Sequence, residues 1–307
     1  MKIAIMGAGG VGGVLGARLV AAGHEVHFIA RGAHLEALRA SGLELLSPNG
    51  DLRLERVRAT DDPATIGPVD VVVFAVKMGD AAEAARRCTG LVGKDTAVVP
   101  YLNGVEAPEL IATALPAGNV LGGVAYVSAV IDRPGVIRQT GTFQRFVHGE
   151  LDGRSSTRAT AWAEALVAAG IDAVATRGIR EELWRKFVLL AANSGLTAAT
   201  RSDVGTIRST PELRQLLAEA VAEGIAVARA EKVALPADTK EQVLAFMEAL
   251  PAEMRSSMQE DLERGKPLEL AWLSGAVQRI GARHGIATPV HRFIHAILLP
   301  HADGGRR

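Results

Sequence analysis

The sequence predicts an α/β domain built on a parallel sheet, followed by an all-α domain. Apolar β-type segments alternate with helical segments up to about residue 177, as expected for strands joined by crossover helices. Residues 69–76 form a nearly continuous apolar run, which is typical of a strand buried on both faces of a parallel sheet. Beyond residue 178 only helical periodicity remains. We therefore expect two domains, residues 1–177 and residues 178–307.

The elements of the first domain follow in order along the chain. Strands are predicted at residues 2–6, 24–30, 69–76, 96–102, 120–131 and 172–176, with antiparallel strands across residues 135–149. Helices are predicted at residues 14–22, 81–87 and 157–169. In the second domain, helices are predicted at residues 181–200, 211–231, 238–250 and 268–283. Pro211 and Pro267 would open two of these helices, where a missing N–H costs nothing.

A glycine-rich loop follows the first predicted strand directly. In the pattern G-x-G-x-x-G, the first glycine permits a tight turn, the second lets the backbone approach a pyrophosphate, and the third lets helix and strand pack closely. The N–H groups of the next helix then face the phosphates. The sequence therefore predicts a Rossmann-type dinucleotide-binding domain, whose glycine loop consists of Gly7, Ala8, Gly9, Gly10, Val11 and Gly12.

The end of the second predicted strand indicates which dinucleotide binds. A domain selective for NAD usually places Asp or Glu there to hold the ribose 2′-hydroxyl, but this chain has Ala30-Arg31. A guanidinium suits a 2′-phosphate, so we expect NADP(H). The alternative is a solvated arginine at a strand end.

Composition excludes several other classes of protein. The 307 residues carry 34 basic and 34 acidic side chains, so no nucleic-acid or anionic membrane partner is expected. No apolar run is long enough to span a membrane. The single cysteine, Cys88, fits a reducing cytoplasm and is expected to be a buried apolar residue. The histidines show no metal-ligand spacing, so we expect no metal.

Five polar residues could carry chemistry. Lys77 and Asn103 follow two predicted central strands, at the sheet edge where ligands bind, although a solvated lysine and an ordinary Asn-Gly turn are the alternatives. Lys186 lies near the start of a very apolar helix, with Asn193 on nearly the same face; a lysine that reaches solvent would also fit. Glu269 follows Pro267 in a predicted first helical turn, where the helix dipole favours a carboxylate in any case.

Together these motifs resemble the ketopantoate reductase family, the NADPH-dependent 2-dehydropantoate 2-reductases. The resemblance covers nearly the whole chain. It rests on the glycine loop with Arg31, on Val76-Lys77, on residues 102–104, on residues 183–186 leading to 196–198, and on residues 256–261 leading to Glu269. It implies a Rossmann-type domain followed by an all-α domain like that of 6-phosphogluconate dehydrogenase. The implied reaction is the reduction of ketopantoate to (R)-pantoate in pantothenate and coenzyme A biosynthesis.

The resemblance also implies roles for individual residues. Lys186 matches the family's catalytic lysine, and Glu269 matches its catalytic carboxylate, which orients the substrate or the lysine. Asn103 matches a residue that touches both cofactor and substrate, Lys77 one beside the cofactor, and Ser257 a serine that binds substrate. Lys186 and Glu269 would contact the substrate as well. A homodimer is compatible with the sequence, in which no segment identifies an interface.

Three positions depart from the family pattern. Where the family has asparagines, this chain has Leu190, Ser194 and Met254, and Asn193 is one residue out of register. Loss of these polar contacts leaves two alternatives open: a reductase of a more apolar 2-keto acid, and a non-catalytic protein that senses NADP. Retention of Lys186 and Glu269 argues against the sensor.

Overall fold

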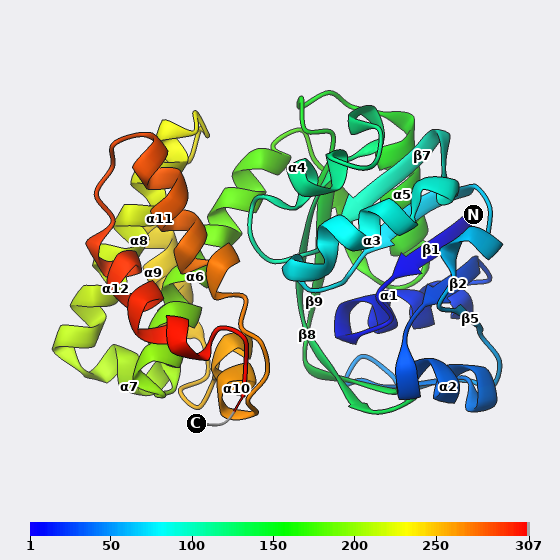
Figure 1. The fold of residues 1–307 in the computed structure, drawn as a ribbon, viewed down its shortest axis with the longest axis horizontal. Helices are drawn as coiled ribbons and strands as arrows, with labels where there is room; N and C mark the ends of the chain where they lie inside the picture. Colours follow the sequence, from blue (N-terminus) through cyan, green and yellow to red (C-terminus); the bar gives the residue numbers. More distant parts are fainter. Residues whose placement is uncertain (306–307) are drawn as a thin grey trace. The chain divides into compact units, whose positions relative to one another are not determined.

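A computed structural model describes residues 1–305 of the chain and divides it into two compact units. The first unit contains Met1–Leu102 and Glu106–Ile179, and the second contains Asn103–Val105 and the chain from Arg180 onward. The first unit is an α/β domain and the second is helical (Figure 1). The predicted fold class is therefore confirmed.

The first unit is built on a five-stranded parallel sheet in the order β5-β2-β1-β6-β7. This is the order of a doubly wound sheet, in which a ligand binds where the order reverses, beside the carboxyl end of β1. β1 and β6 are almost entirely buried, which explains their continuous apolar sequence. The strands are β1 (Lys2–Met6), β2 (Glu25–Ile29), β5 (Arg58–Thr60), β6 (Val69–Phe74) and β7 (Val92–Pro100).

A second sheet completes this unit, and the long β8–β9 hairpin forms most of it (Figure 1). The antiparallel strands predicted across residues 135–149 are a single strand, β9, which pairs antiparallel with β8, and β10 joins β9 in parallel. Two short strands, β3 and β4, were not predicted. The strands are β3 (Leu43–Leu46), β4 (Leu52–Leu54), β8 (Gly122–Arg133), β9 (Val136–Gly149) and β10 (Asp172–Ala175).

Helix α1 (Gly10–Ala21) packs between the two sheets. A Cβ atom at Gly13 would lie 2.5 Å from Ile137 of β9, and one at Gly16 would lie 2.2 Å from Phe28 of β2. Glycine at these positions lets one helix approach two sheets closely. The other helices of this unit are α2 (Gly32–Ser41), α3 (Ala81–Arg87), α4 (Ala107–Ala112) and α5 (Thr157–Ala168).

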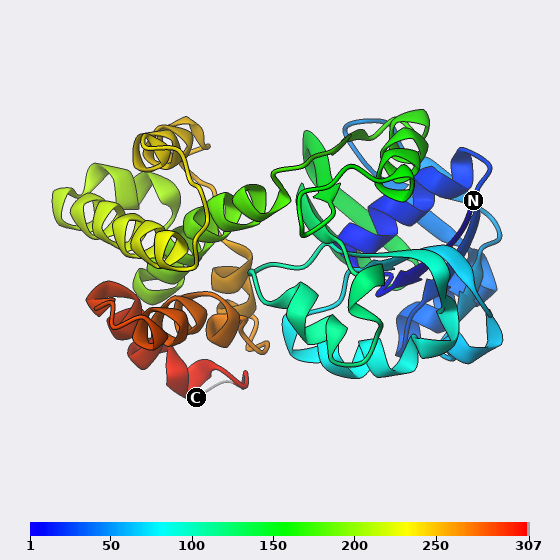
Figure 2. The same ribbon diagram turned by 90° about the horizontal axis from the view of Figure 1, so that it is seen from above.

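The second unit contains helices and no strands in its described part, where it is coloured from green to red in Figure 2. Helices α8, α11 and α12 pack against one another. Val188 of α6 lies against Gly224 of α8, and Gly195 of α6 lies against Ile294 of α12. The helices are α6 (Ile179–Thr200), α7 (Val204–Ser209), α8 (Pro211–Ala230), α9 (Thr239–Ala249), α10 (Ser257–Glu263), α11 (Ser274–Arg283) and α12 (Pro289–Leu298).

The helix predicted at residues 268–283 is wrong before residue 274. No helix begins at Pro267. A short 3-10 turn, Leu270–Trp272, is followed by Leu273 with φ −112° and ψ −100°, and α11 begins only at Ser274. This backbone lies outside the helical region, so Glu269 precedes a separate turn rather than standing in a first helical turn.

Tyr101, Trp162 and His148 form a buried chain of hydrogen bonds in the first unit. Trp162 Nε1 donates to Tyr101 Oη at 3.0 Å, and Tyr101 Oη lies 3.2 Å from His148 Nδ1. His148 Nε2 lies 2.9 Å from the Ala159 carbonyl. Because this carbonyl only accepts, Nε2 carries the proton and Nδ1 accepts from Tyr101. The chain is satisfied only while His148 is neutral.

We expect His148 to make the protein sensitive to acid. Burial lowers the pKa of His148 from its ordinary 6.5 to about 4, so the unfolded chain takes up the proton first on acidification. The stabilisation is complete above about pH 6.5 and is lost as the pH falls toward 4. Between pH 7 and pH 5 it should decrease by about 2 kcal/mol, measured by urea unfolding. Over the same pH interval, the free energy of unfolding of His148→Gln should fall by about that amount less than that of wild type. Equal decreases in the two proteins would contradict the role of His148.

Candidate active site

The glycine loop joins β1 to α1 at the carboxyl edge of the parallel sheet. Gly7 has φ +100°, and its N–H donates to the Ile29 carbonyl at 3.1 Å. A Cβ atom at Gly12 would lie 2.1 Å from the Gly7 carbonyl oxygen, whereas one at Gly9 would have no atom within 4 Å. Gly7 thus makes the turn, Gly12 permits close packing, and Gly9 borders open space. This geometry fits a dinucleotide pyrophosphate.

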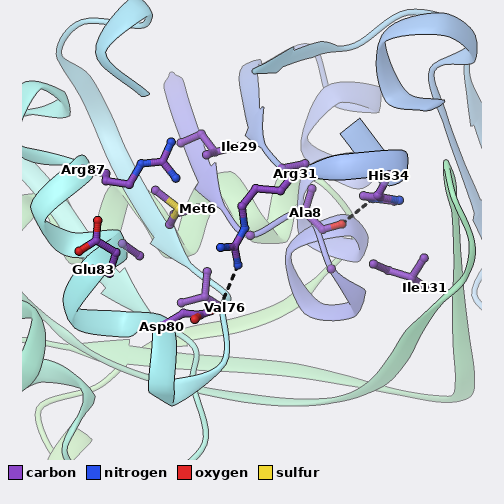
Figure 3. A pocket seen from close by; sticks show the side chains of 14 residues that line it. Met6, Ala8, Ile29, Arg31, His34, Val76, Asp80, Glu83, Arg87 and Ile131 are labelled. Atoms are coloured by element: carbon purple, nitrogen blue, oxygen red, sulfur yellow. Dashed lines mark hydrogen bonds and ion pairs between the residues drawn. The ribbon is translucent and has the colours of Figure 1, made fainter. Parts of the chain in front are cut away.

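A pocket of about 230 Å³ adjoins this loop (Figure 3). Of the residues predicted to bind the cofactor, Gly7, Ala8, Gly9 and Arg31 line it, whereas Gly10, Val11, Gly12, Lys77 and Asn103 are not among its lining residues. Gly10 has a packing role instead, because a Cβ atom there would lie 1.9 Å from the Ala129 carbonyl oxygen of β8.

Arg31 lies two residues after β2, at the N-cap of α2, and lines the pocket; its side chain is 72% exposed. Its Nη2 lies 3.0 Å from Oδ2 of Asp80, which also lines the pocket (Figure 3). A guanidinium at this place can pair with a 2′-phosphate. Lys77 is exposed and stands between Val76, which lines the pocket, and the 3-10 turn Met78–Asp80.

His34 of α2 holds the glycine loop from the side. Its Nδ1 accepts from the Gly135 N–H at 3.1 Å, so its Nε2 carries the proton and donates to the Ala8 carbonyl at 2.8 Å (Figure 3). Burial lowers the pKa of His34 and favours this neutral form. His34 was missed in the sequence because nothing local indicates that α2 returns to the loop.

Lys186, Asn103 and Glu269 meet in the second unit. Lys186 Nζ donates to Asn103 Oδ1 at 3.1 Å, and Asn103 Nδ2 donates to Glu269 Oε2 at 3.2 Å. The amide of Asn103 therefore links an ammonium to a carboxylate. Lys186 is on α6, whereas Glu269 directly precedes the turn Leu270–Trp272.

Asn103 reaches this cluster through the glycine that follows it. Gly104 has φ +96°, and a Cβ atom there would lie 3.1 Å from the Trp272 carbonyl oxygen. A side chain at this position would be strained and crowded. Gly104 thus lets residues 103–105 lie against the turn that carries Glu269, and Asn103 belongs to the second unit although it follows β7 in sequence.

The protonation of Lys186 suits an acid that works near neutral pH. Burial lowers the pKa of Lys186 from 10.5 to about 8, and the carboxylate of Glu269 opposes this lowering. At pH 7 the ammonium therefore predominates. A group with a pKa close to the working pH can donate a proton and be reprotonated readily.

The predicted substrate serine, Ser257, is exposed in the first turn of α10. Its neighbour Ser256 is buried and has a structural role. Ser256 Oγ accepts from the Gln259 N–H at 3.1 Å, capping α10, and from Thr197 Oγ1 of α6 at 2.7 Å. This contact holds the start of α10 against α6 and thereby positions Ser257.

Asn193 is buried on α6, and its Oδ1 has no hydrogen-bond partner among residues 1–305. Buried polar atoms are almost always paired, so this acceptor is unusual. Cys88 is fully buried, and burial raises the pKa of its thiol to about 12, which makes it unsuited to nucleophilic chemistry.

Asp80 and Arg87 also line the pocket and were missed in the sequence. Asp80 lies three residues after Lys77 at the same sheet edge, and that position was the available signal. In the described part of the chain, no cluster of three or more His, Cys, Asp and Glu side chains could hold a metal ion. No helix within residues 1–305 is long and apolar enough to cross a membrane.

Comparison with known proteins identifies relatives along nearly the full length. The family model "Ketopantoate reductase PanE/ApbA" matches residues 3–153, and "Ketopantoate reductase PanE/ApbA C terminal" matches residues 178–301. The chain is 34% identical to a 2-dehydropantoate 2-reductase of Mesorhizobium japonicum over 311 residues, covering 94% of each chain.

Solved structures give the same relationship. The structure of a PanE/ApbA family ketopantoate reductase from Ralstonia eutropha matches with a TM-score of 0.90 and 33% identity, covering 98% of both chains. That of a 2-dehydropantoate 2-reductase from Geobacter metallireducens matches with a TM-score of 0.91 and 31% identity, covering 98% of this chain and 99% of that one.

Proposed function

Because this chain belongs to the ketopantoate reductase family of dinucleotide-dependent oxidoreductases, we propose that it reduces ketopantoate to (R)-pantoate with NADPH. One arrangement supports this reaction above all: an ammonium with a lowered pKa, Lys186, linked through Asn103 to the carboxylate of Glu269. The reaction would place the enzyme in pantothenate synthesis. The relatives' names support the substrate, and the glycine loop supports the cofactor.

NADPH, when bound, supplies the hydride that reduces the 2-keto carbon. As that carbon is reduced, negative charge develops on the carbonyl oxygen. Lys186 Nζ stabilises this charge and donates its proton to the oxygen, so that an N–H bond breaks and an O–H bond forms. Asn103 holds Nζ in place through its Oδ1, and Glu269 favours the charged form of the lysine.

Arg31 supports NADPH over NADH, because its guanidinium lies in the pocket beside the glycine loop. We expect Arg31→Ala to raise the Kd for NADPH by about tenfold to a hundredfold, because a charged hydrogen bond to the 2′-phosphate is lost. The Kd for NADH should change by less than about threefold. Fluorescence titration with each cofactor measures both values.

The control for this experiment is Arg39→Ala, which removes an exposed arginine at the end of α2 that does not line the pocket. It should leave the ratio of the two Kd values unchanged. Equal effects of Arg31→Ala on NADPH and NADH would refute the role of Arg31 in reading the 2′-phosphate.

The substrate is tested with a matched pair of keto acids. Trimethylpyruvate differs from ketopantoate only by lacking the 4-hydroxyl. An enzyme that recognises this hydroxyl should prefer ketopantoate in kcat/KM by about a hundredfold or more.

A second candidate is the reduction of a more apolar 2-keto acid. Two residues favour it, Leu190 on α6 and Met254, which is 37% exposed. Each places an apolar side chain where the family pattern has an asparagine. A preference for trimethylpyruvate would support this candidate. Failure to turn over any keto acid while binding NADPH would favour the non-catalytic sensor.

A further inference from the structure

A carboxylate lines the pocket in which the 2′-phosphate of NADPH would bind. Asp80 Oδ2 pairs with Arg31 Nη2 at 3.0 Å. Figure 3 shows the Arg31 side chain extending from the N-cap of α2 toward Asp80, which directly precedes α3. The exposed fractions of the two side chains are 72% and 52%, so both can be reached by a ligand. The guanidinium expected to bind the phosphate therefore already has an anionic partner.

The other charged groups of this pocket are engaged differently. Glu83 accepts from its neighbour Arg86 through Nε at 3.0 Å and Nη2 at 2.6 Å. Arg87 donates to the carbonyl oxygen of Asp61, a neutral acceptor. Asp80 thus differs from Glu83, because its carboxylate is paired with Arg31, the arginine expected to bind the cofactor phosphate.

A 2′-phosphate carries close to two negative charges at neutral pH, as phosphate monoesters do. When it enters the pocket it must replace Asp80 as a partner of Arg31 or share the guanidinium with it, and it then lies near a like charge. A ribose 2′-hydroxyl meets no such repulsion and can donate a hydrogen bond to a carboxylate. The Arg31–Asp80 pair therefore opposes binding of NADPH and not of NADH.

We propose that Asp80 is a specificity-determining residue that limits the preference for NADPH over NADH by holding Arg31 and repelling the 2′-phosphate. This inference rests on the proposed role of Arg31 in binding NADPH. It predicts that the wild type uses both cofactors with a smaller preference than Arg31 alone would produce, and that Asp80 is the residue to change for a stricter NADPH enzyme.

The test is binding of adenosine 2′,5′-bisphosphate and adenosine 5′-monophosphate, measured by calorimetry on the full chain. Asp80→Asn should lower the Kd for the bisphosphate by about fivefold. The Kd for the monophosphate should stay unchanged or rise. The effect should shrink when the ionic strength is raised to about 0.5 M, because exposed charges are screened. The Asp80 side chain makes no capping hydrogen bond at the start of α3, so the variant should keep the wild-type melting temperature.

Two further variants test the mechanism. Glu83→Gln removes the same charge from the same pocket but leaves Arg31 paired with Asp80. It should therefore lower the Kd for the bisphosphate less than Asp80→Asn does. In an Arg31→Ala background, Asp80→Asn should lose most of its effect, since coupled residues are not additive. The proposed role of the Arg31–Asp80 pair would be overturned if Asp80→Asn and Glu83→Gln raised the affinity for the bisphosphate equally. It would also be overturned if Asp80→Asn raised this affinity as much in the Arg31→Ala background as in wild type.

These measurements need no turnover, so they separate this inference from the proposed reaction. A wild type that binds both nucleotides equally would remove the basis for NADPH selectivity itself. A wild type that prefers the bisphosphate, together with an Asp80→Asn variant that prefers it no more strongly, would overturn only the role of Asp80.

Discussion

Lys186→Ala should lower kcat by about a hundredfold to ten-thousandfold, the usual contribution of a positioned acid. The loss follows because the charge that develops on the carbonyl oxygen then has no ammonium to stabilise it and no proton donor in its place. The Kd for NADPH should stay within about twofold of wild type, since the lysine acts on the substrate. Single-turnover NADPH oxidation, with Kd measured separately, distinguishes the two effects.

The pH profile provides a test that a structural role would not pass. The pKa of Lys186 is lowered to about 8, so kcat/KM of the wild type should fall as the pH rises through that value and the ammonium is lost. Lys186→Ala should lack this alkaline limb. Lys94→Ala, which removes an exposed lysine of β7, is the matched control and should keep both rate and limb. An alkaline limb that survives in Lys186→Ala would assign the titration to another group.

Glu269→Gln should lower kcat/KM by about tenfold to a hundredfold and move the alkaline limb to lower pH. The rate falls because a charged partner of the Asn103 amide becomes neutral, and such hydrogen bonds contribute about 1.5–3 kcal/mol. The limb moves because the carboxylate raises the pKa of Lys186 against burial, and its removal lets that pKa fall further. The measurement is kcat/KM from about pH 6 to pH 10.

Asn103→Ala is the matched comparison for Glu269→Gln. It removes the link between Lys186 and Glu269 but leaves both charges in place. Its activity should fall as well, while its alkaline limb should shift less than that of Glu269→Gln. A limb in Glu269→Gln that is unchanged from wild type would contradict the electrostatic role of this carboxylate.

Local patterns were sufficient where an element depends on its own residues and its immediate neighbours. The unit formed by β1, the glycine loop, α1 and β2 could be predicted because a buried strand needs continuous apolar residues and a pyrophosphate turn needs glycines. Helix α3 (Ala81–Arg87) agrees with the predicted residues 81–87, and α5 and α8 agree within one residue at each end. The break at Leu273 was missed, because helical periodicity continues across it in sequence.

The sequence by itself determined the fold class, the family and the glycine loop, since each depends on residue types at short spacing. Only the tertiary structure decided which distant side chains meet. Asn103 follows a strand of the first unit but pairs with Lys186 and Glu269, which lie 83 and 166 residues further along the chain. Arg31 and Asp80, 49 residues apart, pair within one pocket. Such contacts depend on how the elements pack, and no local period encodes packing.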